Sequence, residues 1–389
     1  MTKFVGLLRG SASGVSEEHP GAIAPLQYPQ RFQGVFADRR ESLLPLIEEA
    51  RRALHALPIP ETLKPYYHAV VRDNPQPSFL LLPLMYLTVA EASGGIQAAH
   101  RGFLPLMMLS LEACAIVDDT VDRTPMRSER PTFPMRFGEA STAPFVSTLV
   151  SLVAQETVRL EPRLFASTMR LFSELFSLQL WERHHIYPTE DLFERWLDNR
   201  YRENTVGVSF GLDTALLLNG REPSPPSVPE AFGRIFQDVD DIVNILENRS
   251  AQGENDDLLM GAVTRPLLLT LEKHPALRAD LSALWDVCRP MANAPVAELQ
   301  RESPHSRATL EKLSRPLRQA LREVGVPGTV EHVLADYRTC VASSPPELRQ
   351  VIQELTSTWV DRLRRCKGVA LIDEDQLQSA LEGMPLEAA

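Results

Sequence analysis

An all-α fold is the class that this sequence predicts, and three observations indicate it. Apolar residues recur three and four positions apart along most of the 389-residue chain, and no stretch alternates long enough to form a useful strand. Only 19 glycines are present, which disfavours all-β and Rossmann-type folds with their many tight turns. The 31 prolines mostly fall between the apolar stretches, as expected for residues that separate helices. We therefore expect a single-domain helical bundle around a central apolar cavity.

The helices follow one another from residue 43. The first has one apolar face, made by Leu43, Ile47, Ala50, Leu54 and Leu57, and PIPETLKP (58–65) ends it. Further helical patterns cover about 78–92, 96–122, 141–158, 162–186, 190–219, 229–248, 264–272, 276–302, 307–324, 329–341 and 346–366. The helix at 96–122 is apolar nearly all round from Phe103 to Val117, so it must be buried on every side.

Composition and charge exclude several classes of protein. With 40 basic and 51 acidic residues the net charge is −11, which does not indicate a nucleic-acid partner. The four cysteines lie far apart without CxxC spacing and fit a reducing cytoplasm. The longest apolar stretch, 79–90, is too short to span a bilayer, which takes about 20 residues. We expect a cytoplasmic protein with no transmembrane segment: a flexible leader at 1–30, the helical domain at 31–370 and a tail at 371–389.

The apolar helix at 96–122 ends in a group of carboxylates. Asp118 and Asp122 are four residues apart and share one helical face, with Asp119 beside them. Three carboxylates at the end of an apolar helix are costly unless something positive joins them. Oxygen ligands of this kind suit Mg²⁺, which usually binds through one or two carboxylates plus a substrate phosphate. We therefore expect Asp118 and Asp122 to bind metal, with Asp119 in support.

A second group of the same form lies on the helix at 229–248. Asp240, Asn244 and Asn248 are spaced four residues apart along one face, and each offers an oxygen to a hard cation. Asp241 is expected to support them. A lone acidic motif on a helix is most often a solvated face, but here two such helices are present and one follows a fully apolar run. Facing each other across an apolar cavity, they would hold several Mg²⁺ ions around one diphosphate.

These motifs resemble those of the trans-isoprenyl diphosphate synthases and of the class I terpene synthases that share their α-fold. DDTVD (118–122) is similar to the family's first aspartate-rich motif, and FQDVDDIVN (236–244) to its second. The segment 257–266 matches the family's Asp-Leu-x-x-Gly-x-x-Thr-x-Pro. The resemblance covers roughly residues 75–300. It implies a prenyl diphosphate substrate, three Mg²⁺ ions with Mn²⁺ as a substitute, and a homodimer.

The sequence departs from the elongating members of this family at the site for isopentenyl diphosphate. Those members hold that diphosphate with a Gly-Lys-x-x-Arg-Pro segment and the second Arg of an Arg-Arg pair. Phe79 and Leu82 stand at the Lys and Arg positions here, and Ser128 replaces the second Arg. Losing three hydrogen bonds to a charged group would cost roughly 5–9 kcal/mol, against about 8 kcal/mol for micromolar binding. The resemblance therefore implies that the isopentenyl site is nearly abolished.

The contacts to the remaining diphosphate are also predicted from the resemblance. The segment 200–208 is similar to the Arg-Arg-x-Thr-x-Gly-Val helix of bacterial terpene cyclases, in which an arginine senses the diphosphate. We assign Arg202 and Thr205 to this role, together with Arg127 and Gln237. The stretch 240–248 partly matches the cyclases' Asn-Asp-x-x-Ser-x-x-x-Glu, with Asn244 at the Ser position and Asn248 in place of Glu.

The depth of the pocket is predicted from the residues before the first motif, because bulky side chains there cap it in elongating relatives. Cys114 and Ala113 hold those positions and Ser110 lies one turn further, so all three are small. An open floor favours a C20 substrate, geranylgeranyl diphosphate, over C15 farnesyl diphosphate. Phe79 and Phe210 are candidates for the wall, although core packing is the commoner role of such rings.

The resulting hypothesis is an Mg²⁺-dependent terpene cyclase that ionises one prenyl diphosphate. A first alternative is a chain-elongating or acceptor-transferring prenyltransferase. A second is a non-catalytic partner subunit of an active synthase, although the retention of both acidic groups argues against it.

Overall fold

The computed structural model is almost entirely helical, which confirms the predicted all-α class. It describes residues 40–57, 59–71, 81–127, 130–247, 257–290 and 304–365. The predicted leader (1–30) and tail (371–389) lie outside the described residues, so these boundaries stay predictions. Within the described ranges, no helix combines the length and the apolar character that crossing a bilayer would require.

The chain enters the bundle through two helices. In α1 (Arg40–His55) the predicted face is buried, with Leu43, Ile47, Ala50 and Leu54 at most 2% exposed. The helix α2 (Lys64–Val71) was not predicted, because we read the prolines before it only as a break. Pro65 lies in the first turn of α2, where a missing N–H costs nothing.

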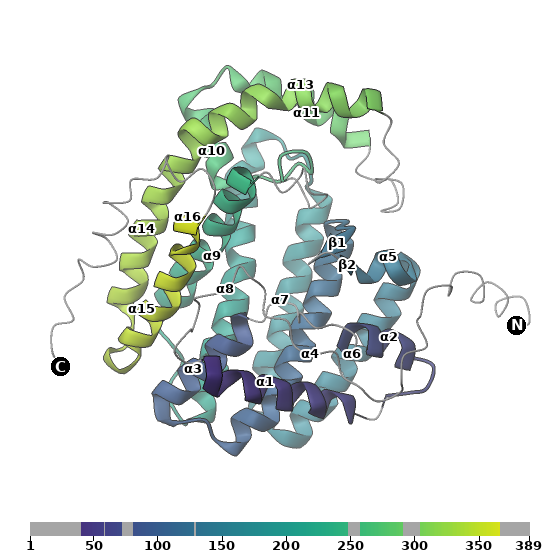
Figure 1. Cartoon of the computed structure of the whole chain (residues 1–389), viewed down its shortest axis with the longest axis vertical. Coiled ribbons are helices and arrows are strands. Elements are labelled where there is room, and N and C mark those ends of the chain that lie inside the picture. Colours follow the sequence, from purple (N-terminus) through teal and green to yellow (C-terminus); the bar gives the residue numbers. More distant parts are fainter. Residues whose placement is uncertain are drawn as a thin grey trace, which may run out of the picture.

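Six long helices form the centre of the molecule (Figure 1). They are α3 (Leu81–Gly94), α4 (Ala98–Val121), α6 (Glu139–Leu160), α7 (Phe165–His184), α8 (Phe193–Leu218) and α9 (Ser227–Glu247). Every residue of α4 from Phe103 to Ile116 is buried, as the all-round apolar pattern predicted. The short 3₁₀ turns η3 (Pro162–Leu164) and η4 (Glu190–Leu192) precede α7 and α8.

Helices α8 and α9 approach each other closely at Gly233. A Cβ atom built at this residue would lie 2.7 Å from the backbone nitrogen of Thr205, which is closer than real contacts allow. Glycine at 233 therefore lets the two helices, which carry the candidate site, pack backbone against backbone.

A hairpin follows α4 and was missed because its strands are so short. Strand β1 (Met126–Arg127) pairs antiparallel with β2 (Arg130–Pro131), and α5 (Phe133–Phe137) comes next. The hairpin turns the chain back toward the end of α4, which brings Arg127 to the first acidic motif.

The last third of the chain forms two groups of helices. Helices α10 (Arg265–Lys273), α11 (Leu277–Cys288) and α13 (Pro304–Ala320) form an upper layer with its own apolar cluster around Trp285 (Figure 1). Helices α14 (Val326–Ser343), α15 (Pro346–Val360) and α16 (Arg362–Arg365) run down beside α9.

One break that the sequence predicts is absent. A π-helical turn, η7 (Leu321–Gly325), joins α13 directly to α14, so the helix continues where we expected two helices separated by a turn. Gly325 in this turn lies against α10, where a Cβ atom would approach the carbonyl oxygen of Pro266 to 2.3 Å. The π-helical hydrogen-bond pattern therefore lies at a close contact between helices.

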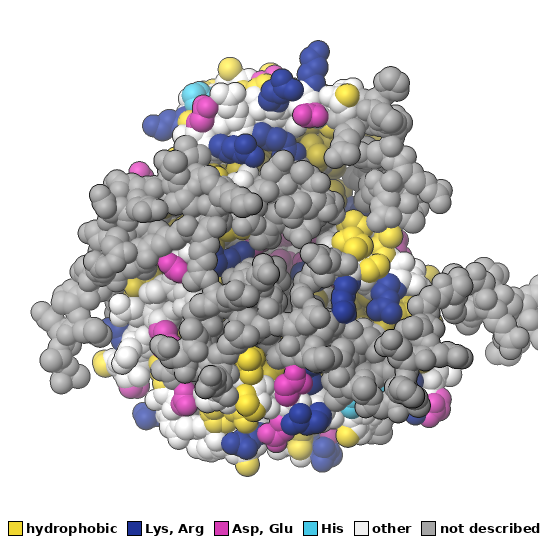
Figure 2. Space-filling view, viewed as in Figure 1, with side chains coloured by type: hydrophobic (Ala, Val, Ile, Leu, Met, Phe, Trp, Pro, Cys, Tyr) yellow, Lys and Arg dark blue, Asp and Glu magenta, His cyan; other side chains and the backbone are white. Residues whose placement is uncertain are grey.

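Acidic and basic side chains are interspersed among the described residues on the face shown in Figure 2. The described residues on this face therefore form no extended basic surface, in keeping with the net charge of −11.

Candidate active site

The first acidic motif lies at the C-terminal end of α4 and is paired with one arginine. Arg127 of β1 places Nη2 2.5 Å from Oδ2 of Asp118 and 2.7 Å from Oδ1 of Asp119. Its Nε also donates to Oδ1 of Asp119, at 2.8 Å. Burial raises the pKa of Asp119 to about 6, and the positive charge of Arg127 opposes this rise only in part. Asp118 and Asp119 thus share the guanidinium of Arg127 in this structure.

Asp122 completes this motif at the turn after α4. Its backbone N–H donates to the carbonyl of Asp118, and its side chain is exposed. Even so, the pKa of Asp122 is raised well above its usual value, first by loss of water to the surrounding protein and then by the charges of Asp118 and Glu182.

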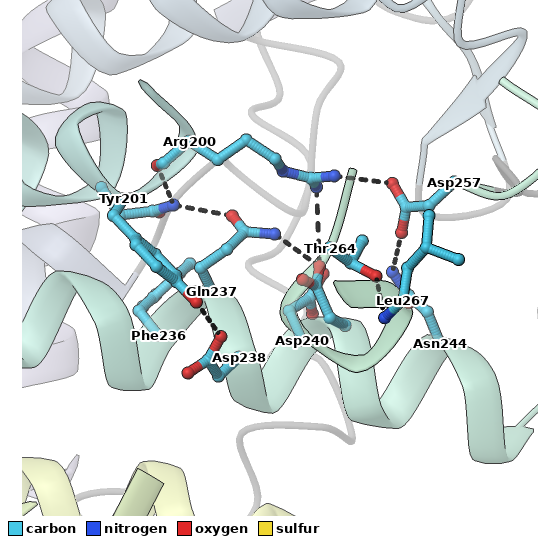
Figure 3. A network of polar contacts seen from close by, with 12 residues as sticks. Arg200, Tyr201, Phe236, Gln237, Asp238, Asp240, Asn244, Asp257, Thr264 and Leu267 are labelled. Atoms are coloured by element: carbon cyan, nitrogen blue, oxygen red, sulfur yellow. Dashed lines mark hydrogen bonds and ion pairs between the residues drawn. The ribbon is translucent and has the colours of Figure 1, made fainter. Parts of the chain in front are cut away.

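The second acidic motif is paired with an arginine of α8 (Figure 3). Arg200 donates from Nη1 to Oδ1 of Asp257 at 3.0 Å, and its Nη2 lies 3.6 Å from Oδ1 of Asp241. Asn244 donates to the other oxygen of Asp257 at 3.5 Å. Asp241 is only 1% exposed, so this group is far more deeply buried than Asp122.

Amide side chains extend this network toward α8. Gln237 donates to Oδ1 of Asp241 at 2.6 Å and accepts a hydrogen bond from Asn204 at 2.7 Å. Gln237, Asp241 and Asn244 therefore share one face of α9, in the i, i+4, i+7 arrangement of a helix. Gln237 therefore lies beside the acidic network, and its assignment to the diphosphate stays a prediction.

Arg200 lies between the two motifs. Burial alone would lower its pKa, but four carboxylates outweigh burial and raise it well above its usual value. These carboxylates come from the second motif and its loop, from α7 and from the first motif: Asp257, Asp241, Glu182 and Asp122. The charge of Arg200 therefore interacts with carboxylates of both motifs, so the fold brings the two motifs to a common place.

Two further acids of this cluster were missed by sequence reasoning. Glu182 of α7 is buried, and burial raises its pKa to about 7. Glu203 of α8 has its Oε1 atom buried with no hydrogen-bond partner among the described residues. Its pKa is raised well above the usual value by burial, then by Glu182 and Asp118. The signal for Glu203 was its spacing, three residues after Arg200 and so on the same face of α8.

This cluster has the chemistry of a site for divalent cations. Asp241 is buried and its Oδ2 atom has no hydrogen-bond partner among the described residues, while several neighbouring carboxylates are held at raised pKa values. Such a surplus of buried negative charge is relieved by cations. No three Asp, Glu, His or Cys side chains of the described ranges are grouped to hold a metal by themselves. Mg²⁺ needs no such group when substrate phosphates supply its other ligands.

The comparisons with known proteins decide the family. The family model described as polyprenyl synthetase matches residues 83–301, more than half of the chain. This chain belongs to the polyprenyl synthetase family. The matched residues include both acidic motifs, the hairpin with Arg127, and Arg200.

Solved structures of polyprenyl synthetases share the fold. A decaprenyl diphosphate synthase from Rhodobacter capsulatus is 17% identical with a TM-score of 0.62, covering 85% of this chain and 99% of its own. A polyprenyl synthase from Caulobacter crescentus, complexed with calcium and isoprenyl diphosphate, is 13% identical with a TM-score of 0.64, covering 86% and 99%.

Curated relatives are fungal terpene synthases. A bifunctional terpene synthase of Fusarium proliferatum is 23% identical over 223 residues, which is 53% of this chain and 28% of that protein. The fusoxypene synthase of Fusarium oxysporum is 26% identical over 258 residues, covering 62% and 32%. The chain thus spans less than a third of the length of these relatives.

Within this polyprenyl synthetase fold, the structure does not bring Arg202 to the acidic cluster, in contrast to our prediction. Arg202 is 64% exposed and pairs with Glu174 at 3.3 Å. Two residues along a helix turn a side chain by about 200°, so Arg200 points inward and Arg202 outward. Thr205 donates its hydroxyl to the carbonyl of Tyr201 and lies against Gly233, which places it at the α8–α9 contact.

Asp240, another predicted ligand of the second motif, accepts a hydrogen bond from Arg362 of α16, at 3.3 Å. Asn248 lies outside the described residues, so its assignment as a metal ligand stays a prediction. A small pocket of about 40 Å³ lies beside the motif, between Asp241, Asn244 and Asp257 on one side and Arg318 and Arg322 on the other.

The predicted open floor is not seen. Ser110 and Ala113 have no exposed surface, and the hydroxyl of Ser110 donates to the carbonyl of Leu106. Cys114 is 2% exposed, and Phe210 packs edge-on against Phe103 in the core. Neighbouring side chains fill the space beside these residues, because small residues allow adjacent helices to pack closely. Phe79 lies outside the described residues.

The isopentenyl position that the structure describes is apolar and closed. Leu82 is 8% exposed, and its Cδ1 lies 3.4 Å from where a Cβ atom of Gly207 would be. It belongs to the contact between α3 and α8, where no cation is held. Ser128 lies outside the described residues.

Proposed function

We propose that this chain is a class I terpene synthase, which ionises a linear prenyl diphosphate and cyclises the allylic cation. One observation carries the proposal: both acidic motifs act on Arg200, whereas Leu82, at the position of an isopentenyl-binding arginine, is buried in an apolar helix contact. A site of this kind is suited to one diphosphate ester. The names of the fungal relatives support the same activity.

The diphosphate would be bound by the side chains of the two acidic motifs and their arginines. Asp118, Asp122, Asp240 and Asn244 would hold Mg²⁺, with Asp119 and Asp241 beside them; Mn²⁺ is the expected substitute. Three bound ions would neutralise the charge that builds up on the departing diphosphate. Arg127 and Arg200 would donate to its oxygens, since guanidinium groups bind phosphate in a bidentate manner.

Ionisation breaks the bond between C1 of the prenyl chain and the diphosphate oxygen, and the electron pair leaves with that oxygen. The carbon chain is then an allylic cation that water would trap. Apolar side chains of the central helices exclude water, which leaves the chain's own double bonds as the nucleophiles. The proposed C20 chain requires the packed side chains near Ser110, Ala113 and Cys114 to move apart on binding.

A second candidate is prenyl transfer, either to isopentenyl diphosphate or to another acceptor. The family model is that of polyprenyl synthetases, and one relative is named bifunctional. Because the chain spans less than a third of that relative, the activity in its name need not reside in the matched part. The surplus of buried carboxylates speaks against the third candidate, a non-catalytic partner subunit.

One assay separates these candidates. Purified protein is incubated with Mg²⁺ and geranylgeranyl or farnesyl diphosphate, with and without isopentenyl diphosphate, and both hydrocarbons and chain lengths are analysed. A cyclic hydrocarbon or alcohol formed without isopentenyl diphosphate is the expected result. Products that appear only after its addition would establish chain elongation instead. No product in either tube, with both substrate lengths, would favour the partner subunit.

The setting of the enzyme belongs to the same proposal. We place it in the cytoplasm as a homodimer without a nucleic-acid partner. Size-exclusion chromatography with light scattering measures the oligomeric state, for which a mass of twice 43.5 kDa is expected.

A further inference from the structure

The C-terminal helices contact the second acidic motif through Arg362. Its Nη2 lies 3.3 Å from Oδ1 of Asp240, and its side chain is 6% exposed, whereas that of Asp240 is 35% exposed. A buried guanidinium thus holds one side of a carboxylate whose other side reaches solvent. The family model ends at residue 301, so this contact comes from a part of the chain that the family match does not include.

An aromatic platform fixes the position of Arg362. Its guanidinium carbon lies 4.2 Å from the ring centroid of Trp359. Trp359 in turn stacks on Phe236, with centroids 4.3 Å apart and rings 8° from parallel. The indole N–H of Trp359 also donates to the carbonyl of Phe236 at 3.1 Å. Phe236 lies one turn before Asp240 on α9, so the platform rests on the same helix as the carboxylate that Arg362 holds.

The two neighbouring aspartates of this motif point to different cations. Asp240 pairs with Arg362 and Asp241 with Arg200. Successive residues of a helix are turned by about 100°, and here the two carboxylates face arginines on different helices. The orientation of Asp241 is therefore set from α8, and that of Asp240 from the C-terminal helices.

We propose that Arg362, held on the Trp359–Phe236 platform, is a positioning residue that orients the carboxylate of Asp240 for a divalent cation. The stacking and burial of the guanidinium keep it in place, so its role is to hold Asp240 rather than to reach for the substrate. This inference rests on the proposed function, since it assumes that Asp240 binds metal for a diphosphate ester. Groups that hold metal-binding side chains typically change metal affinity roughly 10- to 100-fold when removed.

The test measures metal binding without turnover. Unfolding temperatures are recorded in inorganic pyrophosphate while Mg²⁺ is titrated, for the wild type, Arg362→Gln and Arg362→Lys. We expect the Mg²⁺ concentration at half-maximal stabilisation to rise about tenfold or more in Arg362→Gln. Lysine keeps the charge without the planar fork, so a smaller rise is expected for Arg362→Lys.

A matched control removes another ion pair between α9 and a C-terminal helix. Arg234 of α9 lies six residues before Asp240 and binds Asp336 of α14 at 2.8 Å. Arg234→Gln should lower the unfolding temperature in EDTA while leaving the Mg²⁺ midpoint unchanged. A merely structural role of Arg362 would give the same pattern, with a lower unfolding temperature and an unmoved midpoint, and would overturn the inference.

The two proposals fail in different ways. If the wild type gains no stability from Mg²⁺ and pyrophosphate, the proposed function fails. If the wild type responds normally and the midpoints of the Arg362 variants equal the wild-type value, only the role of Arg362 is wrong. Should Arg362→Gln not fold, Arg362→Lys and Trp359→Phe serve for the same comparison. Each weakens the stacking between residue 362 and the platform, while Arg362→Lys keeps a positive charge and Trp359→Phe keeps an aromatic ring.

Discussion

The two acidic motifs differ in where their arginines come from. The first motif is held by Arg127, only eight and nine residues beyond Asp119 and Asp118. The second is held from far along the chain: Arg200 is 57 residues before Asp257, and Arg362 is 122 residues after Asp240. The first arrangement can form with the local hairpin alone, whereas the second exists only when α8, α9 and the C-terminal helices are packed together.

The arginine partners also differ in the burial of their carboxylates. The carboxylate of Asp118 is 24% exposed, whereas that of Asp241 is fully buried. The other two aspartates do not follow this order, since the side chain of Asp119 is 7% exposed and that of Asp240 is 35% exposed. The contact of Arg200 with Asp241 therefore depends most on both partners, because water cannot replace a lost ion pair there. We accordingly expect substitutions in the first motif to lower mainly turnover, and substitutions in the second to lower both turnover and the free energy of unfolding.

The largest expected effect is on turnover, and it should be alike for both motifs. Asp118→Ala and Asp240→Ala are each expected to lower turnover of geranylgeranyl diphosphate about 100- to 1,000-fold, because each removes stabilisation of the leaving diphosphate. Helicity by circular dichroism should stay close to the wild-type value. Unchanged turnover in both variants would refute the metal assignment.

The second prediction separates the motifs by stability. Arg200→Met leaves buried carboxylates without their cation and should lower the free energy of unfolding by about 3–5 kcal/mol. Arg127→Met should cost less, roughly 1–2 kcal/mol, because Arg127 and Asp118 are partly open to solvent. Urea unfolding at pH 7.5 in EDTA measures both. Equal losses would show that distance along the chain and burial do not distinguish the motifs.

The third prediction concerns pH. Burial raises the pKa of Asp119 to about 6, of Glu182 to about 7 and of Asp238 to about 7. An acid with a raised pKa binds more protons in the folded than in the unfolded state, so stability falls as pH rises from about 4 toward these values. The unfolding temperature in EDTA should therefore decrease between pH 5 and pH 7.

A variant sharpens this pH comparison. Glu182→Gln should flatten the decrease between pH 6 and pH 7, where Asp119 of the first motif has already lost its proton. It should also raise stability at pH 8, since it removes a buried charge. An unaltered pH profile would mean that Glu182 is not held at a raised pKa.

The smallest effect is expected for Arg202. Because this side chain is 64% exposed and pairs with Glu174 at the surface, Arg202→Gln should change turnover less than about twofold. Steady-state kinetics with geranylgeranyl diphosphate provide the check, with Arg200→Met as the contrasting variant. A large loss in Arg202→Gln would restore our original assignment of the diphosphate sensor.

The sequence predicted what depends on local pattern. Apolar spacing identified the long helices, and the all-round apolar run of α4 correctly indicated burial. The similar form of the two acidic motifs also led us to expect that their helices face each other. The arginine between them was not predicted, because the motif match selects Arg202, whereas the phase of α8 around its axis turns Arg200 inward.

Features that depend on distant packing were beyond the sequence. Glu182 and Glu203 belong to no motif, and only the packing of α7 and α8 makes them part of the cluster. Arg362 lies in a region without a recognisable pattern, and its partner is on another helix. The closed floor at Ser110 and Ala113 was missed because residue size predicts available room, whereas neighbouring side chains decide whether that room is filled.

The π-turn at Leu321–Gly325 has a consequence for how this chain tolerates length changes. A π-turn is equivalent to one extra residue inserted into an α-helix. Deleting a single residue there would therefore restore α-helical winding and leave the helix downstream near its present rotation. A deletion in the regular part of α14 before Asp336 would instead rotate the residues after it by about 100°. Asp336 would then turn away from Arg234. The π-turn is therefore a place in this helix where the chain can lose one residue and keep the contacts of its last helices.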